Sequence, residues 1–299
     1  MFSPKTLSLA FLAFIFLLPA LIRAQPTSTD LQKVFRQLEQ QAGGRLGMAA
    51  TLLESGQTLS YQASQRFPMQ SVYKFPIGMA VLRQVDLGKL RLDQTVRIAK
   101  EEYVGEKQHS PIRDKNPGGA SLSLREILRY AVSESDGTAS DVLLRIVGGA
   151  PVVMAYLKGL GVTGIIVKNT EKEIGSADSV QYANWAQPEA VVTLLKALHE
   201  GRGLSQNSRA LLLRLMTETP TGLNRLKGRL PVGTRVAHKT GTSRTVDGKT
   251  AATNDVGIIT LPGNRHLAVA VFVSDARTDE VTRENVIAQV AKILWDHWQ

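Results

Sequence analysis

The distribution of strand-like and helix-like segments is the feature that most constrains the fold of this chain. Alternating stretches rich in Val, Ile and Leu occur in two groups, one near each end of the sequence. The long segment between the two groups shows mostly helical periodicity, and a further helical segment flanks each group. Strands segregated from helices in this way indicate an α+β fold rather than a repeated β-α-β unit.

The expected elements follow the chain in that order. Strands are expected at residues 45–54, 57–62, 234–242, 252–261 and 266–274. Helices are expected at residues 30–41, 71–82, 124–132, 138–147, 152–160, 188–198, 205–216 and 281–298, with a short turn of helix at 223–228. We expect the five strands to form one antiparallel sheet, with the terminal helices on one face and the central helices forming a second lobe.

The N-terminal 24 residues differ from the rest of the chain. Lys5 precedes a short apolar run at residues 7–18, and Ala24 is a small residue suited to cleavage before Gln25. This pattern is typical of a secretory signal peptide. The run is short for a membrane span, so an uncleaved anchor is the lesser alternative. We therefore expect a periplasmic protein, with no membrane association once residues 1–24 are removed.

Composition excludes several other functions. The chain has no cysteine, which excludes disulfides, thiol catalysis and lipid attachment to cysteine. The net charge is +10, but the basic residues are scattered without interleaved aromatics, so an anionic small substrate fits better than nucleic acid. The five histidines occur singly and none forms a ligand pair at helical spacing, so we expect neither metal nor cofactor.

The stretch at residues 70–74 reads Gln-Ser-Val-Tyr-Lys and precedes an apolar run long enough for a buried helix. Ser71 and Lys74 would share a face at the positive end of that helix. A serine becomes a nucleophile when a neighbouring group takes its proton, and a desolvated lysine can do so. Taken alone, Ser-x-x-Lys favours the ordinary alternative, a capped core helix with a surface lysine.

Three further stretches have both a chemical and an ordinary interpretation. Ser135-Asp136-Gly137 lies between two expected helices and is typical of a helix cap and turn. The stretch 238–243, His-Lys-Thr-Gly-Thr-Ser, ends an expected edge strand, where a glycine often marks close approach of a ligand or a bulge. Glu171 lies in segment 168–184, which has no clear period and the length of a functional or disordered loop.

Taken together, these motifs identify a family. The order Ser-x-x-Lys, Ser-Asp-x, Lys-Thr-Gly is the pattern of class A β-lactamases and penicillin-binding proteins. Ser135 follows Ser71 by 64 residues, and Lys239 follows Ser135 by 104. The sequence resembles class A β-lactamases from Asp30 to Trp298. Its resemblance to the PER- and VEB-type branch rests on the stretches 180–185, 221–222, 225–228 and 251–255.

The resemblance implies a two-lobed architecture with the active site between the lobes. Residues 25–70 and 219–299 would form a discontinuous α/β lobe around a five-stranded antiparallel sheet. Residues 71–218 would form an inserted helical lobe.

The resemblance also implies a role for each matching residue. Ser71 would be the acylated nucleophile, Lys74 its proton-accepting neighbour, and Ser135 the proton relay to the lactam nitrogen. Glu171 would activate the water that hydrolyses the acyl-enzyme, and whether Lys74 or Glu171 is the acylation base is disputed. The backbone N–H groups of Ser71 and Thr242 would form the oxyanion hole. The substrate-binding positions would be His109 at the cleft entrance, Gly137 and Gly241, with Arg225, Lys239, Thr240, Thr242 and Ser243 around the substrate carboxylate.

Several positions depart from the family pattern. Gly137 and Gly175 replace side chains that hold the substrate amide and the hydrolytic water. Lys172 stands where many members have proline after the glutamate. Asn169 and Asn184 replace the arginine–aspartate pair that commonly closes the loop. Acylation of Ser71 is expected to survive these changes, and the efficiency of deacylation becomes the open question.

We therefore expect a secreted, monomeric serine β-lactamase whose partner is a small β-lactam and which confers β-lactam resistance. A penicillin-binding D-Ala-D-Ala peptidase is the first alternative. A β-lactam-binding sensor that acylates without turnover is the second. Glu171 on its loop favours the hydrolase, because hydrolysis of an acyl-enzyme needs a positioned base.

Overall fold

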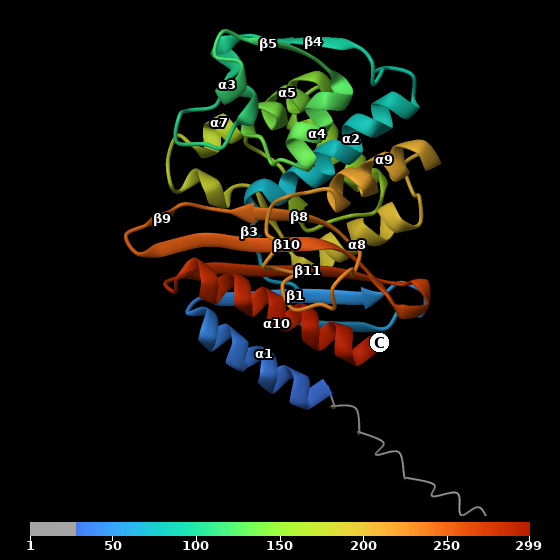
Figure 1. The fold of residues 1–299 in the computed structure, drawn as a ribbon, viewed down its shortest axis with the longest axis vertical. Helices are drawn as coiled ribbons and strands as arrows, with labels where there is room; N and C mark the ends of the chain where they lie inside the picture. The colour runs from blue at the N-terminus through green and yellow to red at the C-terminus, as the bar shows by residue number, and fades with distance from the viewer. Residues whose placement is uncertain (1–27) are drawn as a thin grey trace, which may run out of the picture.

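A computed structural model describes residues 28–299, so the expected signal peptide at residues 1–24 lies outside the described part of the chain. A central antiparallel sheet has two helices on one face and a thicker layer of helices on the other (Figure 1). The α+β architecture predicted from the segregation of strands and helices is confirmed.

The central sheet has the strand order β2-β1-β11-β10-β8, with β9 paired to β10. Its strands are β1 (Arg45–Leu52), β2 (Thr58–Tyr61), β8 (Val236–Thr242), β9 (Thr245–Val246), β10 (Lys249–Leu261) and β11 (Arg265–Ala276). The sequence predicted the five main strands but not β9 or the first three residues of β10. These close a hairpin at Asp247-Gly248, where φ values of 49° and 70° match the left-handed turn that this dipeptide favours.

Helices α1 and α10 cover one face of the sheet, and the remaining helices lie on the other face or beyond it (Figure 1). Among residues 28–299, no single helix is long and apolar enough to cross a membrane. Helices α5 (Gly137–Val147) and α6 (Ala150–Gly159) have the required length and composition only as a pair, and that pair is bent by 74°. The helices are α1 (Ser28–Ala42), α2 (Lys74–Asp86), α3 (Pro111–Lys115), α4 (Leu124–Val132), α5 (Gly137–Val147), α6 (Ala150–Gly159), α7 (Glu171–Ile174), α8 (Pro188–His199), α9 (Gln206–Thr217) and α10 (Glu280–Trp298).

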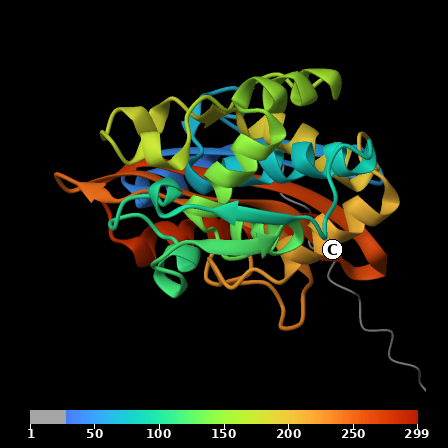
Figure 2. The ribbon, with the colours of Figure 1, turned by 90° about the horizontal axis from the view of Figure 1, so that it is seen from above.

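Short strand pairs join segments that sequence periodicity left unassigned. Strands β4 (Thr95–Ile98) and β5 (Ala120–Ser123) pair above the helical layer, on the side away from the sheet (Figures 1 and 2). Strands β3 (Phe67–Pro68), β6 (Ile165–Ile166) and β7 (Trp185–Ala186) form a small sheet, in which β6 precedes and β7 follows the 168–184 loop. Two to four residues are too few for a period-2 signal. The segment 223–228, predicted as a turn of helix, forms hydrogen-bonded turns instead, with Arg225 N donating to Gly222 O.

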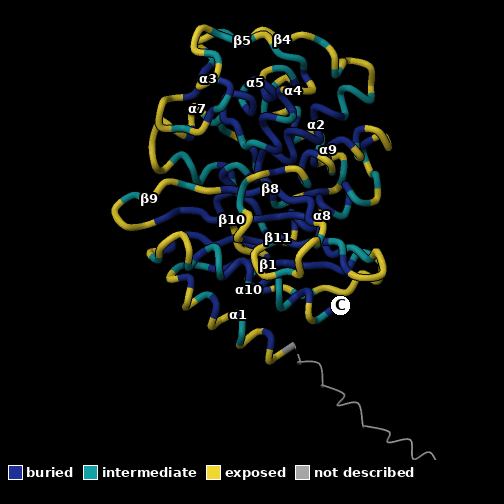
Figure 3. The backbone as a smooth tube through the Cα atoms, in the orientation of Figure 1, coloured by how far each residue is buried: buried dark blue, intermediate teal, exposed yellow. Residues whose placement is uncertain are grey.

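The sheet separates two apolar cores, and successive side chains along β11 point alternately into one core and the other. Leu267, Val269, Val271 and Val273 point toward α1 and α10, whereas Ala268, Ala270 and Phe272 point into the helical layer. Residues 74–82 of α2 are all buried, and α2 packs against α4, α5, α6 and α9. Figure 3 shows the sheet and α2 as the buried centre of the molecule. This buried helix begins where the Ser-x-x-Lys motif ends.

Candidate active site

The Ser71 segment is a 3-10 helix, η1 (Gln70–Tyr73), that runs directly into α2. Gln70 has a φ of 47°, an unfavourable conformation for a residue with a side chain, and its amide donates to Gln181 Oε1 at 2.8 Å. Backbone strain of this kind is concentrated at functional sites. The predicted α-helix therefore starts at Lys74, and Ser71 lies one turn earlier, partly exposed in a cleft.

Lys74 links the serine to the predicted water-activating residue. Its Nζ donates to Ser71 Oγ at 2.6 Å and to Glu171 Oε2 at 2.7 Å. The lysine is 1% exposed, so this hydrogen-bonded ion pair is shielded from solvent. Tyr73 Oη donates to the same Glu171 oxygen at 2.6 Å. The arrangement gives a proton path from Ser71 through Lys74 to Glu171.

The environment keeps Glu171 ionised. Burial acts to raise the pKa of Glu171, but the Lys74 charge and the bonds from Lys74 and Tyr73 outweigh it, so the net shift is downward. Burial raises the pKa of Tyr73 well above its ordinary value, with the Glu171 and Asp141 charges adding to the effect. Tyr73 therefore stays protonated as a donor, and Glu171 is a carboxylate at neutral pH.

The turn between α4 and α5 presents Ser135 to the same site. Ser135 has a φ of 60°, and its Oγ accepts from Lys239 Nζ at 2.9 Å. Asp136 caps α5 through Ala139 N at 2.8 Å, and it also accepts from Ile112 N at 2.7 Å. The helix-cap interpretation is therefore correct for Asp136, and the cap orients the turn that carries Ser135.

Strand β8 brings the Lys-Thr-Gly motif against η1. Lys239 is fully buried and donates to Thr240 O as well as to Ser135. Burial lowers the pKa of Lys239 well below its ordinary value, and the nearby Lys74 charge lowers it further. A side chain at Gly241 would collide with the carbonyl oxygen of Met69, so the glycine permits close approach of the strand to the nucleophile segment, where the sequence predicted a ligand contact or a bulge.

Arg225 is buried beneath the strand rather than free in the cleft. Its guanidinium donates to Asn254 O at 3.0 Å, Thr242 Oγ1 at 2.8 Å and Glu284 Oε1 at 2.9 Å. The side chain is 4% exposed but still contributes to the cleft wall. Arg225 thus fixes the end of β8 and adds positive charge behind it.

A cleft of about 390 Å³ joins these elements. Of the predicted positions, Ser71, His109, Ser135, Glu171, Arg225, Thr240, Thr242 and Ser243 line it. Lys74 and Lys239 reach it from below through their bonds to the two serines. Gly137 is buried, and a Cβ there would lie 2.8 Å from Glu171 Cγ, so glycine makes room for the glutamate.

The loop carrying Glu171 is ordered by its own hydrogen bonds. Thr170 caps α7, placing Glu171 at its first position, and Asp141 accepts from Glu171 N at 2.6 Å and Lys172 N at 2.9 Å. Burial raises the pKa of Asp141 to about 6. Asn184 Oδ1 accepts from Lys168 N and Asn169 N, and its amide donates to Asn169 O. The two asparagines therefore close the loop with neutral hydrogen bonds.

Gln108 occupies the space beside Gly175. Its amide donates to the backbone oxygen of Glu171, and its Oε1 accepts from Gly105 N at 3.1 Å. A Cβ at Gly175 would lie 2.5 Å from the Gln108 amide group, so the two positions are sterically coupled. Sequence reasoning missed Gln108, Asp141 and Tyr73. Only Tyr73, inside the Ser-x-x-Lys motif, carried a local signal.

Comparisons with known proteins show which family the sequence matches. A family model described as "Beta-lactamase enzyme family" matches residues 27–298. The sequence is 45% identical to extended-spectrum β-lactamase PER-1 of Pseudomonas aeruginosa, over 77% of this chain and 75% of that protein. It is 40% identical to β-lactamase VEB-1 of the same species, over 85% of each. A crystal structure of a β-lactamase from Chitinophaga pinensis superposes with a TM-score of 0.87 at 48% identity, covering 89% of this chain and 98% of that one.

Proposed function

The chain belongs to the class A β-lactamases and resembles their PER- and VEB-type branch, and on that premise we propose that it hydrolyses β-lactams through an acyl-enzyme on Ser71. β-Lactamase activity and β-lactam resistance follow from the family. The serine mechanism and the role of each residue are our proposal. The observation that carries it is the buried chain of contacts from Ser71 Oγ through Lys74 Nζ to Glu171 Oε2, at 2.6 and 2.7 Å.

Acylation begins with a change of protonation at Lys74. Before the attack, Lys74 releases one proton to the solvent of the cleft and becomes the amine beside Ser71 Oγ, so Glu171 stays a carboxylate throughout this half-reaction. Ser71 then attacks the lactam carbonyl carbon as its proton passes to Lys74. The backbone N–H groups of Ser71 and Thr242 stabilise the oxyanion, and such donors typically contribute about 3–4 kcal/mol each.

Ring opening requires a proton on the departing nitrogen. Ser135 lies between the substrate position and Lys239, which donates to its hydroxyl at 2.9 Å. As the carbon–nitrogen bond breaks, Ser135 gives its proton to the lactam nitrogen and is reprotonated with the proton that Lys74 took from Ser71. The product of this half-reaction is a single ester on Ser71 that carries the amine of the opened ring.

Deacylation uses Glu171 as a general base. Its carboxylate takes a proton from a water, whose oxygen bonds to the ester carbon while the bond to Ser71 Oγ breaks. The proton returns to Ser71 through Lys74. The low pKa of Glu171 is compatible with this role, because the base is ionised at neutral pH.

Substrate binding relies on the positive wall of the cleft. Thr240, Thr242 and Ser243 would meet the substrate carboxylate, with Lys239 and Arg225 supplying charge from behind. An incoming carboxylate also favours the charged form of buried Lys239, opposing the desolvation that lowers its pKa. His109, exposed at the entrance, would contact the side chain of the substrate.

The proposal keeps three further expectations. Residues 1–24 act as a cleaved signal peptide, and the mature protein is a periplasmic monomer without membrane association. Residues 25–70 with 219–299 form one lobe and 71–218 the other, with catalysis between them. The meeting of Ser71 and Ser135 from the helical segment with Lys239 from β8 supports this division.

Hydrolysis of a panel of penicillins and cephalosporins, with the first turnover recorded, tests the proposal. We expect a stoichiometric burst followed by sustained turnover. A burst followed by near-zero turnover would favour the β-lactam sensor. Sustained cleavage of D-Ala-D-Ala peptides without β-lactam hydrolysis would favour the peptidase.

A further inference from the structure

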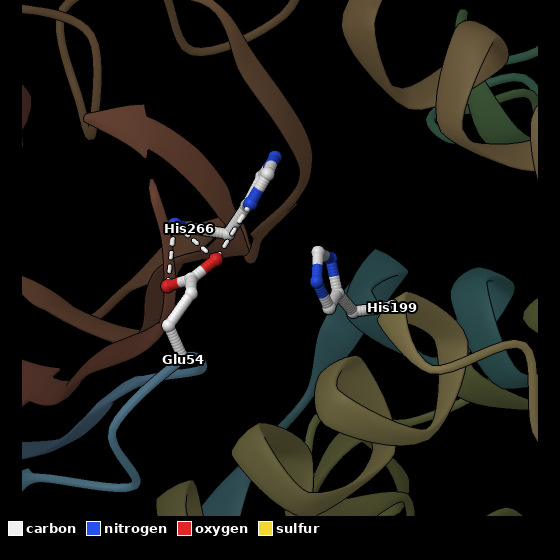
Figure 4. A group of neighbouring side chains, drawn as sticks. All are labelled: Glu54, His199 and His266. Atoms are coloured by element: carbon white, nitrogen blue, oxygen red, sulfur yellow. Dashed lines mark hydrogen bonds and ion pairs between the residues drawn. The ribbon is translucent and has the colours of Figure 1, made fainter. Parts of the chain in front are cut away.

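Three potential metal ligands meet at one end of the sheet (Figure 4). Glu54 follows β1, His199 is the last residue of α8, and His266 is the second residue of β11. One ligand atom from each lies within 4.8 Å of the other two. Glu54 and His266 are 212 residues apart, so sequence spacing could not reveal the cluster.

Two of these ligands are already held in place. The Glu54 carboxylate accepts from His266 N at 2.9 and 3.0 Å, and its Oε1 lies 2.9 Å from His266 Nδ1. Leu53 N donates in turn to His266 O at 2.9 Å. These backbone contacts fix the carboxylate and the imidazole relative to each other, which reduces the entropy lost when both bind one ion.

His199 faces this pair from the helical layer. The His199 and His266 ring centroids are 4.5 Å apart with the planes at 45° (Figure 4). A tetrahedral ion with bonds of about 2.0 Å needs ligand atoms roughly 3.3 Å apart, so a side-chain rotation of His199 closes the site.

We propose that Glu54, His199 and His266 bind one divalent transition-metal ion of the zinc type, with water completing its coordination. Two imidazoles and one carboxylate suit Zn²⁺, whereas Mg²⁺ and Ca²⁺ prefer all-oxygen sites. The ion replaces the proton between His266 Nδ1 and Glu54, and His266 keeps a proton on Nε2.

The position of the cluster indicates a structural effect. Helix α8 packs against β1 and β11, so the ion would join the end of the helix to two segments of the sheet. Along β10, Thr253 pairs with Thr242 at the cleft and Thr260 pairs with His266. Seven residues of strand span about 23 Å. The ion would therefore stabilise the fold without taking part in the chemistry at Ser71.

Metal binding to the untagged, EDTA-treated protein tests the inference. Calorimetry with Zn²⁺ and visible absorption with Co²⁺ should show one ion per chain, and saturating Zn²⁺ should raise the thermal midpoint. His199→Gln and His266→Gln should each weaken binding by about tenfold or more, because loss of a residue that only hydrogen-bonds to a metal ligand typically costs about 10–100-fold. The matched control is His297→Gln in α10, which should bind as the unmodified protein does.

Equal affinity in His199→Gln and the unmodified protein would overturn the inference, as would an equal loss in His297→Gln. If His266→Gln fails to fold, His199→Gln decides the question, because its ring is only partly buried and bridges two layers. Metal-free His199→Gln should hydrolyse β-lactams at the unmodified rate. Binding is read by calorimetry, so the result does not depend on the proposed serine mechanism.

Discussion

Ser71 and Glu171 contact the same lysine, but the chain holds them by different means. Ser71 stands at the entry to α2, whose residues 74–82 are all buried in the main core. Glu171 stands on a four-residue helix held mainly by hydrogen bonds, with Ile174 as its buried apolar contact. Core packing therefore supports Ser71, the proposed nucleophile, whereas Glu171, the proposed base for deacylation, depends on individual polar contacts that a single substitution can remove.

The largest expected effect comes from Ser71→Ala. Loss of the proposed nucleophile should lower hydrolysis by about 10⁴-fold or more. The thermal midpoint should stay near that of the unmodified protein, because Lys74 keeps its partner Glu171. Rate measurements alongside thermal unfolding check both points. Turnover within a hundredfold of the unmodified rate would exclude Ser71 as nucleophile.

Gln108 tests the polar support of Glu171. Gln108→Ala frees the Glu171 carbonyl, and misplacement of the base should lower kcat by about 10–100-fold while the acylation burst remains. Exposed Glu106→Ala is the matched control. An unchanged kcat in Gln108→Ala would show that the loop holds Glu171 without it.

The steric coupling of Gln108 and Gly175 gives a double-mutant cycle. Gly175→Asn alone should impair deacylation, because the new side chain meets the Gln108 amide. Combined with Gln108→Ala, the same asparagine should cost much less. Additive losses in the double variant would contradict a shared space.

Substitution of Arg225 tests the positive wall of the cleft and should have a smaller effect on hydrolysis. Arg225→Ala removes the donors to Thr242 and Asn254 and the charge behind them, so KM should rise about tenfold with a smaller change in kcat. Arg225→Lys should recover only part, since lysine keeps the charge but not the planar fork. A fall in kcat at constant KM would move Arg225 from binding to the chemical step.

Asp141 gives an effect on stability that is read from the pH dependence of unfolding. Its pKa is about 6 when folded and 3.8 in the reference state, so the folded protein binds more protons between these values. Its contribution to the free energy of unfolding therefore falls as pH rises from about 4 to 6. Asp141→Asn should remove this pH dependence. The free energy of unfolding of the variant, relative to that of the unmodified protein, should therefore rise by up to about 2–3 kcal/mol between pH 4 and pH 7.

Urea unfolding at the two pH values checks this prediction. The matched control is Asp247→Asn, in the exposed turn between β9 and β10. A pH dependence in Asp141→Asn equal to that of the unmodified protein would place the titration elsewhere.

The same difference between core and loop explains what the sequence could predict. The Ser-x-x-Lys, Ser-Asp-x and Lys-Thr-Gly motifs are local patterns, and periodicity located the main helices and strands around them. The support of Glu171 comes from Gln108 and Asp141, which are 63 and 30 residues away and carry no local pattern. The substitution of glycine at 137 and 175 was visible, but its steric reason required the neighbouring side chains.

Intact-mass measurement of Glu171→Gln mixed with a penicillin tests the central claim most directly. If acylation uses Ser71 and Lys74, and hydrolysis of the ester uses Glu171, as proposed, this variant should gain the mass of one substrate and keep it for many minutes. Peptide mapping should place the added mass on Ser71, whereas the unmodified protein should return to its own mass as substrate is consumed. A Glu171→Gln protein that never gains mass would contradict the account, because Glu171 would then be required before the acyl-enzyme forms.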